Sequence, residues 1–457
     1  MASRRIDLVL ESVRRLLRLG AMPNLLNLLL KQHPADLAEI ITELSEKDRH
    51  TAFNGLVERN SQLAMETVSE LGPEKGAELL ALRPAGEIAR LMQLIPQDDA
   101  AALLGQLPEE LSSAALDLIK PKPGVGVTEL LEYEEKTAGR LMNPNVFALS
   151  EDLTAGEAIT TLQTSRDVEM VFYLYVVDNR RHLVGVVSLR RLLLVAPNTP
   201  LKTIMTTDVY SARVDTDQED VAKHVASYNL LALPIVDAEN KLVGLITVDD
   251  VIDVLKEEAT EDVLRLAGVS GDDSVLSTPR ESLLKRMPWL QVNLITAFIA
   301  AYVVGLFTKT IKAAPIIAAY MPVVAGMGGN AATQTLAIVV RGLALGELTW
   351  TNARQVVLKE CIVGLGNGVA TGLAGALIVW MTSPAHDWVL GVILGLAMVI
   401  NMFVAAAAGT LIPLALRALK VDPALASSVL ITTFTDVFGF FSFLGLSTLL
   451  LRFLHAG

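Results

Sequence analysis

The sequence predicts a multi-domain protein: an all-α helical-repeat domain (1–130), an α/β domain built on a tandem repeat (131–258), a connecting helix (259–285) and an α-helical polytopic membrane domain with five transmembrane helices (286–457). Three observations support this division. Charged residues are concentrated in the first 285 positions, prolines recur at a short interval in the first part, and a strand-rich motif is duplicated in the second. Because these features change at different points of the chain, each part is expected to have its own fold.

The charge distribution separates a soluble part from a membrane part. Residues 1–285 carry 29 basic and 45 acidic side chains, a net charge of −16, whereas the rest carries nine basic and five acidic ones, a net charge of +4, and together these give the −12 of the whole chain. An acidic soluble part argues against nucleic-acid binding and favours cations as counter-ions. The single cysteine, Cys361, excludes an intrachain disulfide framework and is typical of a protein whose soluble part faces a reducing cytoplasm.

The first part contains a short proline repeat. Four prolines are each followed by acidic or small residues and then by an apolar run: Pro73, Pro84, Pro96 and Pro108. Proline at a helix start, with acids in the first turn, marks the beginning of a helix. The repeat therefore predicts short helices stacked into an array over about 20–120, which usually provides a surface and no chemistry of its own.

The second part contains a longer repeat in which a strand, a turn, a second strand and a helix follow one another, with another helix in front (154–164 and 217–228). The offset is 59 residues at three pairs of positions: Asp178 and Asp237, Gly185 and Gly244, Ser188 and Thr247. This order, spacing and duplication resemble a tandem pair of CBS domains over about 138–258. The resemblance implies a module that senses nucleotides or ions.

The CBS resemblance leaves adenine-nucleotide binding open. In that family the second strand usually leads into Gly-apolar-apolar-Ser/Thr-x-x-Asp, where the Asp can hold a ribose. The second copy keeps this segment with Thr247 and Asp250, but the first copy has Ser188 followed by Arg191 where the Asp would stand. A guanidinium cannot accept hydrogen bonds from ribose hydroxyls. Ser188, Thr247 and Asp250 are therefore candidate nucleotide contacts, with ATP as an uncertain ligand.

Acidic residues are unusually dense between Asp215 and Asp262, where 13 acids face three lysines. On a helix, like charges four residues apart repel by roughly a few tenths of a kcal/mol per pair. A solvated helix face is the simpler interpretation, but divalent cations that bridge carboxylates would relieve the repulsion. The candidate metal ligands in this region are Asp215, Asp217, Glu219, Asp220, Asp249, Asp250, Asp253, Glu257, Glu258, Glu261 and Asp262. Asp98 and Asp99, in the helical array, are candidate partners from another domain.

Five apolar spans follow the soluble region, at about 288–308, 313–340, 356–381, 388–416 and 424–451. Each is long enough to cross a hydrocarbon layer of roughly 30 Å. An odd number places the two termini on opposite sides of the membrane. A cytoplasmic N-terminus leaves seven basic residues near the spans inside and three outside, as the positive-inside rule favours. We expect a multi-pass protein of the cell (inner) membrane with cytoplasmic N-terminal domains and its C-terminus outside.

Polar residues inside two of these spans are candidates for an ion path. Asp436 is the only charged side chain between Ala424 and Leu451, and an acid at membrane depth usually faces a bundle interior or a water-filled path. Oxygen ligands around one carboxylate suit a hard cation, although interhelical hydrogen bonding is the alternative. In the second span, Pro322 and the glycines predict an opened helix that lines a cavity. The candidate pore residues are Asp436, Thr432, Thr435, Ser428, Asn330, Gln334, Gly326, Gly329, Pro322 and Glu360.

The combined motifs resemble the MgtE family of magnesium channels and transporters. They are Pro322-x3-Gly326-x2-Gly329-Asn330-x3-Gln334, Arg286-x-Pro288-Trp289, Tyr133-x5-Gly139-Arg-Leu-Met142 and Asp436. The resemblance covers the whole chain. It implies a homodimer in the lipid bilayer, with the pore at the dimer interface between the second and fifth spans. It also implies that hydrated Mg²⁺ binds at the position of Asp436, and that cytosolic Mg²⁺ between the N and CBS domains closes the pore.

We therefore expect an importer of Mg²⁺ that is not an enzyme. Mg²⁺ gives up its inner waters reluctantly, so an oxygen-lined ring can select the hydrated ion. The chain has no Gly-x4-Gly-Lys-Ser/Thr phosphate loop, which argues against an ATP-driven pump. The alternatives are a transporter of Mn²⁺ or Co²⁺ and a membrane regulator that senses nucleotides through its CBS pair.

Overall fold

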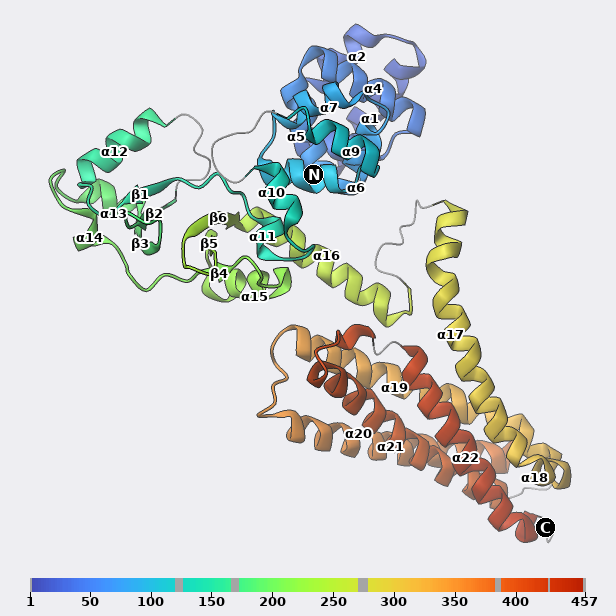
Figure 1. Cartoon of the computed structure of the whole chain (residues 1–457). Helices are drawn as coiled ribbons and strands as arrows, with labels where there is room; N and C mark the ends of the chain where they lie inside the picture. The colour runs from blue at the N-terminus through green and yellow to red at the C-terminus, as the bar shows by residue number, and fades with distance from the viewer. Residues whose placement is uncertain are drawn as a thin grey trace. The chain divides into compact units, whose positions relative to one another are not determined.

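The computed structural model of the chain describes residues 2–119, 126–165, 172–269, 278–382, 388–425 and 428–454. These residues belong to two compact units, Met1–Leu255 and Lys256–Gly457. Helix α16 (Val248–Leu266) contributes to both. Figure 1 labels the helices and strands of each unit.

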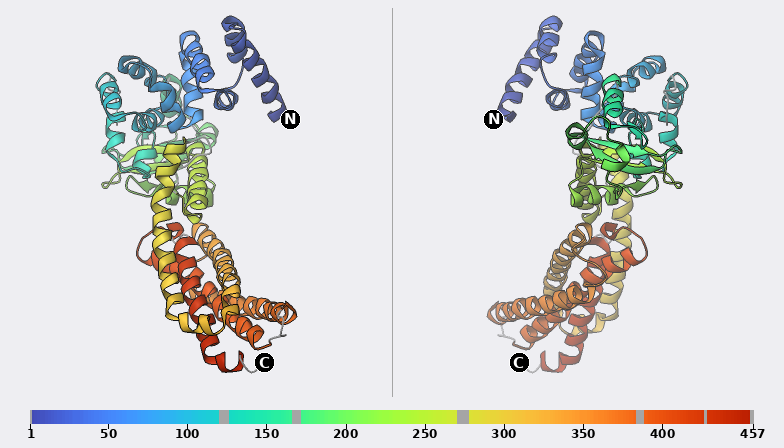
Figure 2. Two further views of the ribbon diagram at one scale, coloured as in Figure 1. Left: turned by 90° about the vertical axis from the view of Figure 1, so that its right-hand side faces the viewer. Right: turned by 90° about the vertical axis from the view of Figure 1, so that its left-hand side faces the viewer.

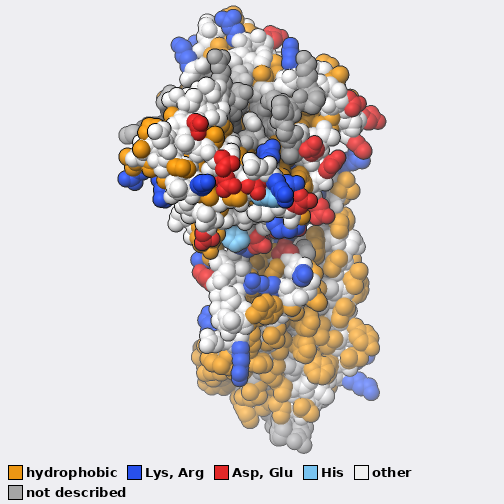
Figure 3. Space-filling model, turned by 60° about the vertical axis from the view of Figure 1, so that its left-hand side comes forward, with side chains coloured by type: hydrophobic (Ala, Val, Ile, Leu, Met, Phe, Trp, Pro, Cys, Tyr) orange, Lys and Arg blue, Asp and Glu red, His pale blue; other side chains and the backbone are white. Residues whose placement is uncertain are grey.

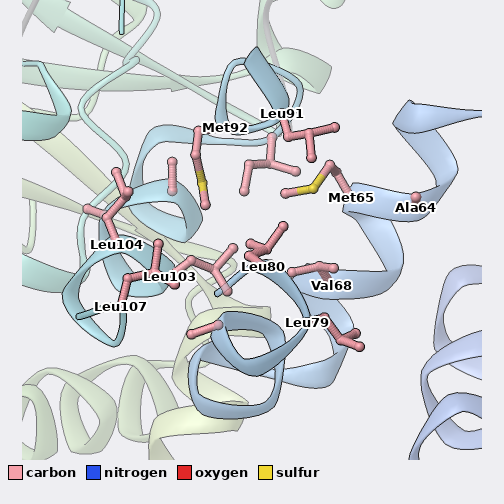
Figure 4. Close-up of a cluster of buried hydrophobic side chains, with 14 of the residues drawn as sticks. Ala64, Met65, Val68, Leu79, Leu80, Leu91, Met92, Leu103, Leu104 and Leu107 are labelled. Carbon is pink, nitrogen blue, oxygen red and sulfur yellow. The ribbon is translucent and has the colours of Figure 1, made fainter. Parts of the chain in front are cut away.

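The first unit begins with a stack of short helices: α1 (Ala2–Arg18), α2 (Met22–Leu29), α3 (Pro34–Thr42), α4 (Glu46–Arg59), α5 (Ser61–Leu71), α6 (Pro73–Leu80), α7 (Ala85–Met92), α8 (Gln97–Gly105) and α9 (Glu109–Leu116). Pro73 is the first residue of α6, and the other repeated prolines directly precede α7, α8 and α9. Leucine and methionine side chains of successive helices meet in a shared core (Figure 4). The predicted helical array is confirmed.

Two similar α/β modules follow the array and the short helices α10 (Val127–Glu132) and α11 (Ala138–Leu141). The first module contains β1 (Ala148–Ser150), α12 (Ala155–Thr164), β2 (Tyr173–Val177), β3 (Leu183–Ser188), α13 (Leu189–Leu194) and α14 (Leu201–Ile204). The second contains β4 (Ala212–Arg213), α15 (Gln218–Tyr228), β5 (Ala232–Val236), β6 (Leu242–Thr247) and the start of α16. In each sheet the first strand is parallel to the second, and the second is antiparallel to the third. The two sheets thus repeat one topology, as the sequence repeat predicts.

The repeated glycines of the third strands allow close packing. A Cβ at Gly185 would lie 2.6 Å from the Met205 sulfur, and a Cβ at Gly244 would lie 2.2 Å from the Met142 sulfur. Any side chain at either position would therefore displace a methionine that closes the module. The glycine repeat therefore reflects the close approach of a methionine to each sheet.

The second unit contains helices long and apolar enough to span a membrane. The described residues include five such segments: Pro279–Leu306, Pro315–Ala344, Ala353–Thr382, Trp388–Ala418 and Val429–Leu450. They correspond to α17 (Pro279–Leu306), α19 (Met321–Ala344), α20 (Ala353–Thr382), α21 (Trp388–Ala418) and α22 (Ser428–Leu454), with α18 (Thr308–Ala313) and the 3-10 helices η1 (Pro315–Tyr320) and η2 (Pro423–Leu425) between them. Hydrophobic side chains cover much of this unit in the view of Figure 3. Helix α17 runs beside α22 in Figures 1 and 2.

Two local features differ from the sequence-based expectations. The connecting segment is not one helix: α16 ends at Leu266, Gly268 has a left-handed φ of 72°, and α17 begins at Pro279. The second span is not opened by its proline, because Pro322 lies in the first turn of α19, where a missing N–H breaks no helical hydrogen bond. Helix α19 is continuous through Gly326 and Gly329.

Candidate functional site

Helix α22 presents Asp436 in a partly buried position of the membrane unit. Its carboxylate makes no hydrogen bond or ion pair with any residue that the structure describes. Thr432, one turn earlier, is also partly buried, and its hydroxyl donates to the Val429 carbonyl at 3.2 Å. A carboxylate without a protein partner inside a membrane bundle retains its full capacity to hold a cation.

Helix α19 presents the polar candidates of the second span at its surface. Pro322, Gly326, Asn330 and Gln334 recur every four residues, and all four are exposed in the single chain. A Cβ added at Gly326 would meet no atom within 4 Å, so this stripe borders open space. A Cβ at Gly329 would lie 3.5 Å from Thr432 Cγ2, which brings the stripe next to the Asp436 segment of α22.

Three other pore candidates are placed differently. Thr435 is 0% exposed, and its hydroxyl donates to the Thr432 carbonyl at 2.9 Å, so it lies on the buried side of α22. Glu360 is 3% exposed, accepts hydrogen bonds from Lys359 Nζ at 2.8 Å and from Thr335 Oγ1 at 3.3 Å, and meets the buried face of α19. Neither joins the exposed stripe, because Thr435 faces the bundle interior from α22 and Glu360 belongs to α20. The Ser428 side chain lies outside the described residues.

The soluble unit brings acids from the helical array and from the second α/β module together. Burial first, and then the charges of Asp250 and Asp99, hold the pKa of Asp98 well above its usual range. The Oδ1 atom of Asp98 is buried and makes no hydrogen bond with any residue that the structure describes. Burial likewise raises the pKa of Asp250 to about 6, helped by the charges of Asp249 and Asp99 and opposed by hydrogen bonds from Thr247. Burial and the neighbouring carboxylates thus both favour the protonated forms of Asp98 and Asp250.

The Asp250 carboxylate is oriented by the start of its own helix. Its Oδ2 atom accepts hydrogen bonds from the Thr247 hydroxyl at 2.6 Å and from the Thr247 backbone N–H at 3.2 Å. Among the described residues, no three His, Cys, Asp or Glu side chains are grouped so that they could hold a metal ion. Mg²⁺ does not require such a group, because it usually keeps several waters and uses one or two carboxylates. Asp98 and Asp250 match that requirement.

Other acidic candidates pair with neighbours in the sequence or lie at the surface. Asp215 forms an ion pair with Arg213 at 2.9 Å, which lowers its pKa. Asp217 accepts from the Glu219 N–H at 2.8 Å as the N-cap of α15, and Glu219 pairs with Lys223 at 2.8 Å. Exposed acids also lie on the first turn of α15 and along α16: Asp220, Asp249, Asp253 and Glu257. Glu258 and Asp262 are partly exposed on α16.

The C-terminal end of α16 contacts the membrane helices. Arg265 forms ion pairs with Glu261 on α16 and with Asp422, just ahead of η2. Leu266 packs against a core formed by α19, α21, η2 and α22, and a Cβ at Gly268 would lie 3.6 Å from Val429. Arg265 was not among the residues predicted from the sequence. It is one of two basic residues in the acidic α16, with Lys256, and it stands four positions after Glu261.

A cavity of about 620 Å³ lies in the first α/β module. Its lining includes Tyr173, Ser188 and Arg190, together with leucines of α13 and Leu231. Thr247 and Asp250 bond to each other and are not part of this lining. The three nucleotide candidates therefore do not line one cavity.

Comparisons with known proteins assign each part of the chain. Residues 321–446 match the MgtE family, described as divalent cation transporters, residues 32–136 match the MgtE intracellular N domain, and residues 138–198 and 201–257 match CBS domains. The chain is 36% identical to the magnesium transporter MgtE of Thermus thermophilus, covering 96% of this chain and 98% of that one. It is 32% identical to the Bacillus subtilis protein of the same name, covering 96% of each. The solved cytosolic domain of the Mg²⁺ channel MgtE in complex with ATP matches with 36% identity and a TM-score of 0.50, covering 54% of this chain and 99% of that one.

Proposed function

The chain belongs to the MgtE family of divalent cation transporters, and on that premise we propose that it carries Mg²⁺ into the cell along a path between the polar faces of α19 and α22. Membership of this family confirms the resemblance predicted from the sequence, and it assigns the chain to multi-pass membrane transporters and not to enzymes. The related proteins from Thermus thermophilus and Bacillus subtilis are named as magnesium transporters.

The observation that carries the proposal is the unpartnered Asp436 carboxylate beside the exposed stripe of α19. Polar groups on the outside of a membrane helix are costly in lipid, so the stripe needs a covering surface. A second copy of the chain supplies one: two Asp436 carboxylates would then face each other across a hydrated path. Thr432, Asn330 and Gln334 offer oxygens to the outer waters of Mg²⁺, which gives up its inner waters reluctantly.

We propose that Mg²⁺ on the cytoplasmic side closes this path by binding at Asp98 and Asp250. A bound ion removes the repulsion between these two carboxylates. The arrangement in which the carboxylates lie close together is then favoured. A ligand shifts such an equilibrium only through its different affinities for the two states, and the buried acids provide that difference. Helix α16 carries Asp249 and Asp250 in its first turn and Arg265, which pairs with Asp422, in its last, so the chain between the acidic cluster and the membrane helices is this helix.

We propose weak adenine-nucleotide binding for the CBS pair. The related cytosolic domain was solved with ATP, and the cavity beside Tyr173, Ser188 and Arg190 is large enough for a small ligand. Arg191 stands where a ribose-binding acid is expected, which removes an acceptor for the sugar. Nucleotide would therefore be a secondary regulator.

The test of transport is Mg²⁺ uptake by proteoliposomes that contain the full-length protein. The Asp436→Asn variant removes the charge and keeps the shape of the side chain, and we expect it to lose most of its flux while it remains folded and dimeric. The matched control is Glu347→Gln, which removes one acid from an exposed loop of the same unit. Wild-type flux through a correctly assembled Asp436→Asn protein would refute the assignment of the path.

A further inference from the structure

Asn401 is a buried amide in the middle of α21, and none of the roles proposed above uses it. Its side chain is 1% exposed. Helix α21 packs against α19, α20 and α22, so a residue at its centre can touch both helices that line the proposed path. The fourth span contains no acidic or basic residue between Trp388 and Leu416, which makes this amide a distinct feature of the bundle.

The Asn401 amide lies in a slot between α19 and α22. Its Nδ2 donates a hydrogen bond to the Val324 carbonyl of α19 at 2.8 Å. A Cβ at Gly328 of α19 would lie 2.2 Å from that Nδ2, and a Cβ at Gly439 of α22 would lie 2.8 Å from it and 3.1 Å from Oδ1. The two glycines therefore make the room that the amide fills.

The slot lies along the same stretch of the two helices as the pore candidates. On α22, Gly439 follows Asp436 by three residues, which is less than one helical turn. On α19, Val324 and Gly328 flank Gly326. Gly329, which follows Gly328, approaches Thr432 of α22. A side chain that fills the slot at this level controls how far apart α19 and α22 lie beside Asp436.

The Asn401 side chain is not explained by stability. Its Oδ1 is buried and makes no hydrogen bond with any described residue, and an unsatisfied buried polar atom lowers stability. An apolar side chain of similar size would avoid that cost. A buried polar residue of this kind can fix the register of packed helices at the expense of stability, as a single buried Asn does in coiled coils.

We propose that Asn401 is a positioning residue that sets the separation and rotation of α19 relative to α22, and thereby the ion selectivity of the path at Asp436. This inference rests on the proposed path. The hydrogen bond to Val324 fixes the rotation of α19, and the amide between the two glycines fixes the gap. When the gap between α19 and α22 changes, the Asp436 carboxylate and the amides of Asn330 and Gln334 suit an ion of a different size. Ion selectivity therefore changes while the helices remain assembled.

The first experiment compares Asn401→Leu with Thr410→Val in the full-length protein. Thr410 is a matched control because it is 0% exposed on the same helix and donates only to Ala406 within that helix. The measurements are Mg²⁺, Mn²⁺ and Ca²⁺ flux in proteoliposomes and the thermal unfolding midpoint in detergent. For Asn401→Leu we expect the Mg²⁺/Mn²⁺ flux ratio to change by about tenfold, the size usual for changes around metal ligands, with no loss of thermal stability. Thr410→Val should keep the wild-type ratio.

A folded Asn401→Leu protein with the wild-type flux ratio would overturn the proposal. Equal loss of flux for all three ions would also overturn it, because that result indicates a structural role alone. If the proposed path itself is wrong, a different experiment shows it: the Asp436→Asn variant then has normal Mg²⁺ flux.

A second experiment tests the slot without using flux. Gly328→Ala places a methyl group against the Asn401 amide and should lower the unfolding midpoint strongly. In an Asn401→Ala background the same substitution should cost much less, because the amide that it meets is gone. Equal costs in the two backgrounds would show that Asn401 does not define the slot and would overturn the proposal.

Discussion

The buried carboxylate of Asp250 makes the stability of the soluble unit depend on pH and on Mg²⁺ in a way that can be calculated. Its pKa rises from 3.8 to about 6 in the folded chain. A rise of roughly two pH units corresponds to about 3 kcal/mol. Because the folded-state pKa is raised, this stabilisation is fully present below about pH 4 and is lost as the pH rises through about 6. In Mg²⁺-free buffer, the wild-type unit should therefore become less stable between pH 4 and pH 7.

Asp250→Asn removes the ionisation and keeps an oxygen that can accept the Thr247 hydrogen bonds. At pH 7 without Mg²⁺ we expect the variant to be more stable than the wild type, by up to about 3 kcal/mol, and to show a flatter pH dependence. Added Mg²⁺ should protect the wild-type soluble unit from protease and should have a much smaller effect on the variant. The matched control is Asp152→Asn, which removes an exposed acid of the first α/β module in the same unit and should behave as wild type.

The assay is proteolysis of the full-length protein in detergent over a urea series, at several pH values and Mg²⁺ concentrations. The midpoint for cleavage of the soluble unit gives its free energy of unfolding. Parallel pH profiles for the wild type and Asp250→Asn would refute the calculation. An unchanged Mg²⁺ titration midpoint in Asp250→Asn would refute the assignment of this carboxylate as a regulatory ligand.

Three further outcomes are expected. Arg265→Met should raise Mg²⁺ flux at high Mg²⁺ on the soluble side, because it uncouples α16 from Asp422, and a wild-type response would show that this ion pair does not transmit closure. Arg191→Asp should strengthen ATP binding to the full-length protein by restoring an acceptor for the ribose, and an unchanged affinity would show that Arg191 is no obstacle. The Asp436→Asn variant should lose Mg²⁺ flux and keep the regulatory Mg²⁺ response of the soluble unit, since the two sites are separate carboxylates.

Much of the fold could be predicted from the sequence because its signals are local or periodic. The prolines at or just before the starts of α6 to α9 mark helix starts through their fixed φ angle. The repeated glycines revealed the two sheets, although only the structure shows that they make room for Met142 and Met205. Gly268 and Pro279 interrupt the predicted connecting helix, and both residue types are known helix boundaries that the long charged pattern outweighed.

The candidate site could be predicted only in part, because residue type does not determine which way a side chain points. Asp436 and Asn330 stood out as polar groups in apolar spans. Thr435 has the same chemistry as Thr432, but it lies on the buried side of α22, and periodicity gave no orientation for a helix that is apolar on all sides. Asn401 was missed because its role depends on glycines of two other helices, Gly328 and Gly439.

Helix α17 gives the surrounding lipid a mechanical connection to the transport path. Its apolar part, 288–306, is about 28 Å long, close to the thickness of the hydrocarbon layer, and only 6% of its most apolar window is buried in the single chain. In a thinner bilayer such a stretch tilts, and in a thicker one the bilayer thins around it. Because α17 packs along α22, a change of tilt is passed to the helix that carries Asp436. Mg²⁺ flux should therefore vary with lipid acyl-chain length, and equal rates in thin and thick vesicles would show that α22 is insulated from bilayer thickness.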